Sequence, residues 1–310
     1  MAWVWLLAGA ALLAVAADRL VAGSAALALR TGISPLLIGL TIVAFATSSP
    51  ELFVSLLAAW QGKPEIAVGN VVGSNIANIG LVLAMAAIIT RVPGDHRVVR
   101  REMPLMVAAV GLLFVLLWNG SLSRLEGVFL LFLLVGFVLW QWHLAAEQRQ
   151  SSPLASDVMA FSGTGMGRAW LYVGLGTVGL YLGSEAFLHG AVDIGRSWGL
   201  SEAVIGLTLV SVGTSLPELA ATVAGAWKRQ VDMILGNIIG SNIFNIFAVL
   251  GITASFIPLS IGDIGPVDLS VMLGFSVLVL AIFFWRGAIG RGLGLGLLAI
   301  YVAYLVFLFA

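Results

Sequence analysis

The chain has 310 residues, of which 60% are hydrophobic and 10% charged, and its formal net charge is zero. Soluble domains have roughly 25% charged residues, so this composition excludes a soluble globular protein and indicates a polytopic helical membrane protein. The chain has no cysteine, which excludes disulfides, thiol chemistry and cysteine-ligated metals.

Ten apolar segments follow one another along the chain, and none shows the polar alternation of an outer-membrane β-barrel. They cover residues 3–29, 33–59, 66–90, 102–118, 124–143, 168–194, 200–226, 232–257, 267–285 and 290–310. The longest polar stretch, 145–167, is typical of a linker. We therefore predict an all-α polytopic membrane protein with ten transmembrane helices, divided into 1–144, the linker and 168–310.

Lys and Arg residues are distributed unequally between the two sides of the membrane. When the loops are assigned to alternate sides, twelve of these residues fall on one side and three, Lys63, Arg124 and Arg196, on the other. Cytoplasmic loops carry the excess. This predicts a multi-pass protein of the cell inner membrane, with both termini outside and the 145–167 linker in the cytoplasm. Its surroundings are the lipid bilayer, and we expect neither a nucleic-acid nor a protein partner.

The two halves contain an internal repeat. A shift of 167 residues aligns 32–83 with 199–250 without a gap, and 24 of the 52 aligned positions are identical. Chance identity in such a composition is about one in ten. Outside this block Asp18 aligns with Glu185, so we expect five spans in each half. Because five is odd, the second half is inverted, and inverted repeats place a transported substrate near the bilayer midplane.

Glu51 is the only charged residue in the 33–59 segment, and Glu218 is its equivalent in the second half. A carboxylate in the middle of a span costs about 2.5–3.5 kcal/mol on insertion scales. The surrounding motifs are Thr47-Ser48-x-Pro50-Glu51 and Thr214-Ser215-x-Pro217-Glu218. Because proline lacks an N–H, it frees carbonyl groups, which we place near Ala44 and Ser211. Carboxylate, hydroxyl and carbonyl oxygens are hard donors that suit Ca²⁺ or alkali cations.

A second motif follows the first in each half. Its copies are Gly69-Asn70-x-x-Gly73-Ser74-Asn75-Ile76-x-Asn78 and Gly236-Asn237-x-x-Gly240-Ser241-Asn242-Ile243-x-Asn245. Asn70, Ser74 and Asn78 stand four residues apart and form one polar stripe on a helix. One interpretation is hydrogen bonding between helices, worth about 0.6–2 kcal/mol per residue, which suits Asn70 and Asn237 best. We favour a ligand shell for the stripe because it recurs in both halves beside a glutamate.

These motifs resemble the α-1 and α-2 repeats of the cation/Ca²⁺ exchanger superfamily and are similar to those of prokaryotic Na⁺/Ca²⁺ exchangers. The resemblance covers the whole ten-span plan. It implies that the second, third, seventh and eighth spans surround the ions, while the first and sixth slide across them. It also implies two backbone ligands, the carbonyls of Ala44 and Ser211. The side-chain ligands that it implies are Thr47, Ser48, Glu51, Ser74, Asn78, Thr214, Ser215, Glu218, Ser241 and Asn245.

The chain departs from this family at two positions. The family commonly has Asp at the place of Asn245 and often Gly at the place of Ala46. The mitochondrial Na⁺(Li⁺)/Ca²⁺ exchanger is similar to this chain in having an amide at the first of these. With amides at both Asn78 and Asn245 the centre has one ionisable group fewer. The ion stoichiometry and the choice among Na⁺, Li⁺ and H⁺ as counter-ion therefore stay open.

We predict a secondary active antiporter that exchanges Ca²⁺ for Na⁺ by alternating access, with these transported ions bound at the midplane and no cofactor. Antiport against H⁺ or Li⁺ is the alternative, and a cation channel or uniporter with the same ligands is a weaker one. We do not expect an enzyme, because neither His-Glu-x-x-His nor a pair of protease-type aspartates occurs.

Overall fold

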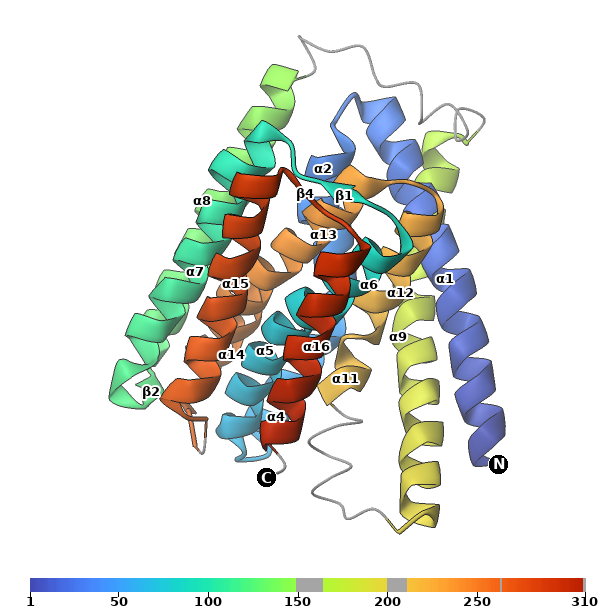
Figure 1. The fold of residues 1–310 in the computed structure, drawn as a ribbon. Coiled ribbons are helices and arrows are strands. Elements are labelled where there is room, and N and C mark those ends of the chain that lie inside the picture. Colours follow the sequence, from blue (N-terminus) through green and yellow to red (C-terminus); the bar gives the residue numbers. More distant parts are fainter. Residues whose placement is uncertain (149–163, 200–210, 263, 309–310) are drawn as a thin grey trace.

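The computed structural model describes residues 1–148, 164–199, 211–262 and 264–308 (Figure 1). In this part of the chain eight helices are long and apolar enough to cross a membrane, and a bent pair of shorter helices makes a ninth span. The seventh predicted span, 200–226, lies outside the described residues as far as residue 210. Its remainder forms two helices.

The first half begins with the long helix α1 (Ala2–Thr31) and the broken second span. That span consists of α2 (Pro35–Ile38), the π-helical turn η1 (Gly39–Val43), α3 (Ala44–Thr47) and α4 (Ser49–Trp60). The third span consists of α5 (Pro64–Ala77), the π-helical η2 (Asn78–Leu83) and α6 (Ala84–Ile89). The remainder of this half comprises β1 (Val92–Pro93), the π-helical η3 (Val98–Glu102), α7 (Met103–Leu116), the 3₁₀ turn η4 (Leu117–Asn119), β2 (Ser121–Leu122) and α8 (Arg124–Gln148).

The second half begins with another long helix, α9 (Met166–Ser197). The described part of the seventh span consists of α11 (Ser211–Thr214) and α12 (Leu216–Trp227). The eighth span consists of α13 (Val231–Phe244), the π-helical η7 (Asn245–Leu250) and α14 (Gly251–Phe256). The remainder comprises β3 (Leu259–Ser260), α15 (Pro266–Arg286), β4 (Ala288–Ile289) and α16 (Arg291–Leu308).

The second span is broken where the sequence places the first motif. The chain bends by 41° between Pro35–Thr47 and Ser49–Trp60, and Ser48 between them has φ −85° and ψ 3°. Pro50 explains the break, because it has no N–H to continue the helical ladder and its ring crowds the preceding turn. The carbonyl end of α3 and the N–H end of α4 therefore meet at the motif.

The helix bounds recur in the second half with an offset of 167 residues. The offset relates α3 to α11, α4 to α12, α5 to α13, η2 to η7 and α6 to α14. Figure 1 shows α1 and α9 side by side, and α1 begins at the end of the molecule where α9 finishes. The two halves are therefore inverted with respect to each other, as the odd number of spans predicts.

Two short antiparallel strand pairs connect the halves, one near each end of the molecule (Figure 1). Val92 of β1 faces Ile289 of β4, and Leu122 of β2 faces Leu259 of β3. The 167-residue offset converts the first pairing into the second, so the repeat extends well beyond the 32–83 block. The sequence did not predict these strands, because two residues are too few to show alternation.

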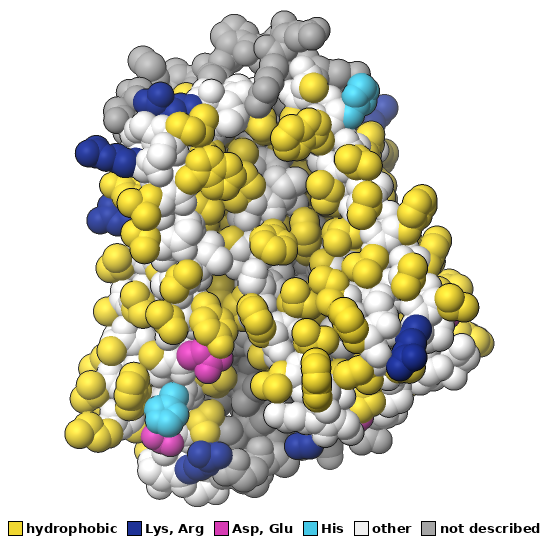
Figure 2. Space-filling model, turned by 180° about the vertical axis from the view of Figure 1, so that it is seen from behind, with side chains coloured by type: hydrophobic (Ala, Val, Ile, Leu, Met, Phe, Trp, Pro, Cys, Tyr) yellow, Lys and Arg dark blue, Asp and Glu magenta, His cyan; other side chains and the backbone are white. Residues whose placement is uncertain are grey.

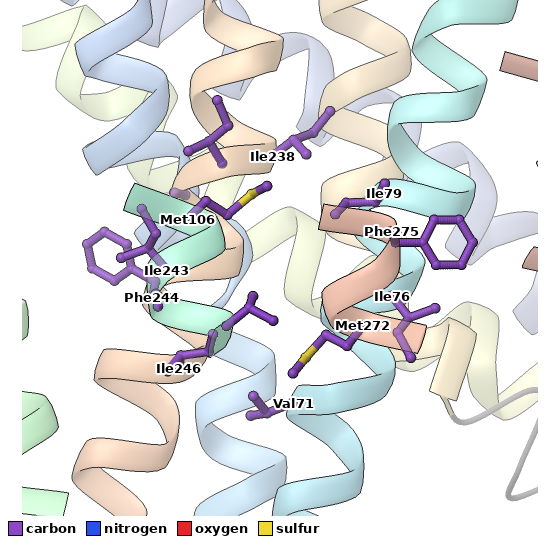
Figure 3. Close-up of a cluster of buried hydrophobic side chains, with 14 of the residues drawn as sticks. Val71, Ile76, Ile79, Met106, Ile238, Ile243, Phe244, Ile246, Met272 and Phe275 are labelled. Carbon is purple, nitrogen blue, oxygen red and sulfur yellow. The ribbon is translucent and has the colours of Figure 1, made fainter. Parts of the chain in front are cut away.

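The span of α13, η7 and α14 lies at the centre of the protein, and its most apolar stretch is entirely buried. A large cluster of buried apolar side chains surrounds it. Figure 3 shows part of this cluster, with side chains contributed by α5, η2, α7, α13, η7 and α15. The labelled residues are Val71, Ile76, Ile79, Met106, Ile238, Ile243, Phe244, Ile246, Met272 and Phe275.

Helices α1 and α9 form a pair at one side of this core (Figure 1). Their buried residues belong to a second apolar cluster, distinct from the central one. The pair packs backbone against backbone at glycines, because a methyl group on Gly176 would overlap Leu20 and one on Gly9 would overlap Phe187. This close approach holds the two helices together as one unit.

Both long helices continue through the charged residues that interrupt their apolar segments. Helix α1 has 30 residues and α9 has 32, so each is about 45 Å long and exceeds the hydrocarbon core. Asp18 of α1 pairs with Lys228, just beyond α12, at 2.6 Å, whereas Glu185 of α9 is exposed. These two acidic residues lie on the periphery of the protein.

The surface has the character expected of a membrane protein. Figure 2 shows a face whose middle is covered by hydrophobic side chains, while most charged side chains on it lie toward the two ends. Trp60 at the end of α4 and Trp227 at the end of α12 are both exposed, and they are equivalent under the repeat. Tryptophan at such positions is typical of the membrane–water interface.

Candidate functional site

The two glutamates of the first motifs lie in the first turns of α4 and α12. Both side chains are completely buried. The Ser48 hydroxyl donates a hydrogen bond to Glu218 Oε1 at 3.2 Å, so the motif of one half reaches the carboxylate of the other. The inverted halves thus bring the two broken spans together in the interior of the membrane domain.

The second motifs supply the other walls of the same region. Asn78 and Asn245 are completely buried, and each is the first residue of a π-helical turn, η2 and η7. Isolated π-helical turns within α-helices occur frequently at functional sites, because they widen the helix and redirect its side chains. Ser74 and Ser241, one turn earlier, are also buried.

Two equivalent hydrogen bonds lock the motifs to each other across the halves. The Thr47 hydroxyl donates to Asn237 Oδ1 at 3.1 Å, and the Thr214 hydroxyl donates to Asn70 Oδ1 at 3.2 Å. The 167-residue offset relates these two bonds. Each threonine at a helix break is therefore held by the third or eighth span from the opposite half.

Ser241 and Ser74 also contact the first motif of the opposite half, but their two contacts are not equivalent under the repeat. Thr47 Oγ1 lies 3.3 Å from Ser241 Oγ, and the Ser215 hydroxyl donates to Ser74 Oγ at 3.4 Å. All predicted side-chain ligands are buried. All of them except Glu51 and Asn78 contact a polar side chain of the opposite half.

Several buried oxygens in this region have no hydrogen-bond partner among the described residues. Among the predicted ligands these are both carboxylate oxygens of Glu51, Oε2 of Glu218, and the side-chain oxygens of Asn78 and Asn245; the side-chain oxygen of Asn242 is another. A buried polar atom without a partner costs roughly 1–3 kcal/mol, and more when it is charged. Five such acceptors from four spans form a set that a cation would satisfy, since a cation offers no hydrogens and binds oxygens directly.

The chemistry of the donors limits which cation fits. Among the described residues no group of three or more His, Cys, Asp or Glu side chains could hold a metal ion. The acceptors are two carboxylates with neutral amide and hydroxyl oxygens around them. Such a set suits Ca²⁺ and alkali cations rather than zinc or copper, which prefer imidazole and thiolate ligands.

Pro50 does not free the carbonyl of Ala44, the first of the two predicted backbone ligands. The Ala44 carbonyl accepts the Ser48 N–H at 2.9 Å. The helical ladder joins each N–H to the carbonyl four residues earlier, and the carbonyl that Pro50 deprives of a partner is therefore that of Ala46. The Ala44 oxygen also lies 3.4 Å from the Thr47 hydroxyl. Because that hydroxyl has one hydrogen and can donate it to Asn237 instead, Ala44 stays a candidate through the second lone pair of its oxygen. Ser211 is the first residue of α11, and its side chain lies outside the described part of the structure.

Asn70 engages in hydrogen bonds through both ends of its amide group. Its Nδ2 donates to Ser55 Oγ at 3.0 Å and to the Glu51 carbonyl at 3.2 Å, while its oxygen accepts from Thr214. Asn70 therefore holds the first turn of α4 in place, in agreement with the hydrogen-bonding interpretation of this residue.

Asn75 and Asn242 are two further buried amides beside the predicted ligands, and the sequence did not distinguish them. Asn245 Nδ2 donates to Asn75 Oδ1 at 3.1 Å, and Asn75 Nδ2 donates to the Asn242 carbonyl at 3.4 Å. Neither residue belongs to the i, i+4, i+8 stripe. The signal that could have revealed them is that both recur in the aligned motifs as amides in an apolar span.

Comparison with known proteins agrees with this geometry. The sodium/calcium exchanger protein family model matches residues 1–143 and 168–310. The chain is 38% identical to the inner membrane protein YrbG of Escherichia coli, over 100% of this chain and 97% of YrbG. It is 32% identical to the sodium/calcium exchanger MaX1 of Methanosarcina acetivorans, over 98% of this chain and 97% of MaX1.

A solved structure of the sodium-calcium exchanger NCX_Mj, soaked with Na⁺ and Sr²⁺, superimposes with a TM-score of 0.86 at 31% identity. The match covers 98% of this chain and 97% of that chain. The prediction of ten transmembrane helices in two inverted repeats is thereby confirmed, and so is the resemblance to the prokaryotic exchangers. The chain belongs to the sodium/calcium exchanger family and is a multi-pass membrane protein that carries out cation antiport.

Proposed function

We propose that this protein exchanges Ca²⁺ for Na⁺ at the site between Glu51 and Glu218. The observation that carries the proposal is the set of unpartnered oxygens, which belong to four spans and include three carboxylate oxygens. The names of MaX1 and NCX_Mj, both sodium/calcium exchangers, support the same choice of ions.

The charge of the site explains why transport takes the form of exchange. Two ionised glutamates without a cation would leave a charge near −2 in a completely buried region. Such a charge is strongly destabilising unless it is compensated. One Ca²⁺ compensates it, and so do two or more Na⁺. The site therefore changes its exposure from one side of the membrane to the other only when it holds Ca²⁺ or Na⁺, and the two ions compete for it.

Helices α1 and α9 are suited to expose the site to alternate sides. They pack tightly on each other at glycines, and they share one apolar cluster with residues of the second, seventh and eighth spans. Movement of this pair over the core would open one face of the site while it closes the other. Because the halves are inverted, the same movement is available in both directions.

The loops assigned to one end of the molecule carry twelve of the fifteen Lys and Arg residues. We assign this end to the cytoplasm. Helix α1 begins and α16 ends at the opposite end of the molecule (Figure 1). In the cell inner membrane, both termini then lie outside and the 145–167 linker lies in the cytoplasm.

The test is uptake of radioactive Ca²⁺ into proteoliposomes that contain the purified protein. Imposed outward gradients of Na⁺, Li⁺, K⁺ and H⁺ are compared at equal ionic strength, and protein-free liposomes are the control. We expect uptake that depends on the Na⁺ gradient. Absence of Ca²⁺ uptake under every gradient would refute the proposal.

A second candidate is exchange of Ca²⁺ for Li⁺ or H⁺ through the same oxygens. It is favoured by the amides at Asn78 and Asn245, which leave Glu51 and Glu218 as the only carboxylates among the proposed ligands. Uptake driven by Li⁺ or H⁺ but not by Na⁺ would select it. Uptake that depends on no counter-ion would instead indicate a channel or uniporter.

A further inference from the structure

Asn75 and Asn242 occupy a special place in the repeat. They are equivalent residues, and yet they contact each other through the Asn75 Nδ2 to Asn242 carbonyl bond of 3.4 Å. In a structure with two-fold pseudosymmetry only residues next to the axis can contact their own equivalents. The pair therefore lies where α5 and α13 pass each other, between the two halves of the site.

The Asn242 carbonyl determines how the neighbouring amides are oriented. A carbonyl oxygen can only accept a hydrogen bond, so Asn75 must turn its Nδ2 toward it. This leaves Asn75 Oδ1 facing Asn245, and Asn245 must then donate its own Nδ2, at 3.1 Å. The Asn245 oxygen consequently points away from Asn75. It is one of the buried oxygens without a partner.

The equivalent chain of bonds is absent from the other half of the described site. Asn242 turns its Nδ2 toward the Ile238 carbonyl of its own helix, at 2.8 Å. Within the described part of the chain, neither polar atom of the Asn78 side chain has a hydrogen-bond partner. The amides stand at the same positions of Gly-Ser-Asn-Ile-x-Asn in both halves, so the difference lies in their surroundings, which include Ala77 at position x in one half and Phe244 in the other.

We propose that Asn75 is a positioning residue that presents the Asn245 oxygen to the transported cation, whereas the Asn78 amide is not held in this way. The proposal rests on the proposed function, since it assigns a role within that cation site. A ligand that is already oriented loses little conformational freedom on binding, so it strengthens binding without an additional contact. Asn75 acts through Asn245 and does not itself touch the cation.

The experiment compares Asn75→Ala with Asn242→Ala, which is a matched control. Both variants remove a buried amide from equivalent positions on equivalent helices. Asn242→Ala keeps the backbone carbonyl that orients Asn75. The readouts are the half-saturating Ca²⁺ concentration and the maximal rate of Na⁺-driven uptake, together with the Ca²⁺-induced rise in unfolding temperature as a measure of binding that does not depend on transport.

We expect Asn75→Ala to raise the half-saturating Ca²⁺ concentration about tenfold, which is the size of effect that loss of one buried hydrogen-bond partner produces. Asn242→Ala should change it by less than about threefold. The decisive arm is the Asn245→Ala background, in which Asn75→Ala should have no further effect on the half-saturating concentration, because the group that it orients is gone. A merely structural role would persist in that background.

Equal effects of the two single variants would overturn the proposal, and so would an Asn75→Ala effect that is unchanged in the Asn245→Ala background. If Asn75→Ala does not fold, Asn75→Thr takes its place in the same cycle, because its hydroxyl is too short to reach both partners. A wild-type protein without any cation-driven Ca²⁺ flux would refute the proposed function itself, which is a separate outcome.

Discussion

The Ser48 hydroxyl donates to Glu218 Oε1 at 3.2 Å, although the two residues belong to opposite halves of the chain. The equivalent hydroxyl, that of Ser215, donates to Ser74. Among the described residues, both oxygens of Glu51 are without a hydrogen-bond partner, whereas Glu218 has one such oxygen. The two carboxylates occupy equivalent places in the repeat but differ in their immediate surroundings, which bears on how each one responds to substitution.

Replacement of both carboxylates should separate transport from folding. We expect Glu51→Gln with Glu218→Gln to lower Ca²⁺ flux by at least about a thousandfold, because the Coulomb attraction of a nearby carboxylate is worth several kcal/mol even at moderate effective dielectric constants. The double variant should express normally and unfold at a temperature no lower than that of the cation-free wild type, since two buried charges are removed. Flux assays and thermal unfolding of the purified proteins measure both effects. Normal flux in this variant would rule out the site.

The unequal surroundings of the two glutamates predict unequal single variants. Glu51→Gln should raise the half-saturating Ca²⁺ concentration more than Glu218→Gln, by about tenfold. The reason is that Glu51 has two unpartnered oxygens to offer and Glu218 has one. Concentration dependence of uptake for each single variant tests this, and an equal or reversed order would contradict it.

Acid should inhibit transport by competition. A proton on Glu51 or Glu218 removes the negative charge that the cation compensates, so the half-saturating Ca²⁺ concentration should rise as the pH falls from about 8 to about 5.5. The maximal rate at saturating Ca²⁺ should change much less. Initial uptake rates over a grid of pH and Ca²⁺ concentration separate the two quantities. Inhibition that high Ca²⁺ does not relieve would argue against proton competition at this site.

Introduction of a third carboxylate should make the protein more sensitive to acid. In Asn245→Asp, mutual repulsion among three carboxylates favours protonation, so the midpoint of acid inhibition should move to higher pH. Asn78→Asp is the matched variant in the other half. Asn245 donates a hydrogen bond to Asn75, so Asn245→Asp also removes a donor and should destabilise the cation-free protein more than Asn78→Asp does. Unfolding temperatures with and without Ca²⁺ measure this difference.

The contact between α1 and α9 should depend on its glycines. Gly176→Val would drive side-chain atoms into the Leu20 backbone, whereas Gly174→Val, two residues earlier on the same helix, meets no described atom within 4 Å of its Cβ. We expect the first variant to lose roughly 1–3 kcal/mol of stability and most of its transport. The second should behave like the wild type. Equal behaviour of the two variants would mean that close packing of this pair is not required.

Composition and hydrophobic segments predicted the class of protein, and the repeat predicted the inverted arrangement of its halves. These inferences need no knowledge of contacts, because burial in lipid requires long apolar helices and an odd number of spans reverses direction. The two glutamates and their hydroxyl neighbours could likewise be identified from the sequence. A charge within an apolar span is too costly to occur twice without a compensating partner.

The choice of hydrogen-bond partners could not be derived in this way. Periodicity assigned Asn70 and Asn78 to one stripe. Asn70 forms hydrogen bonds with Ser55 and Thr214, whereas Asn78 has none to any residue that the structure describes. Likewise, a proline in the sequence indicates a break without stating which carbonyl stays bonded, and the Ala44 carbonyl proves to be paired with Ser48.

The sequence by itself determined that this is a membrane protein of two inverted halves with a pair of buried glutamates. Only the tertiary structure decided that Asn245 donates a hydrogen bond to Asn75, while the equivalent Asn78 has no partner among the described residues. The physical reason is that the amides stand at the same positions in both motifs, and the residues between them do not state which backbone carbonyl each amide will meet. The difference arises from which backbone carbonyl each amide meets when α5 and α13 pack against each other, at a separation of 167 residues along the chain.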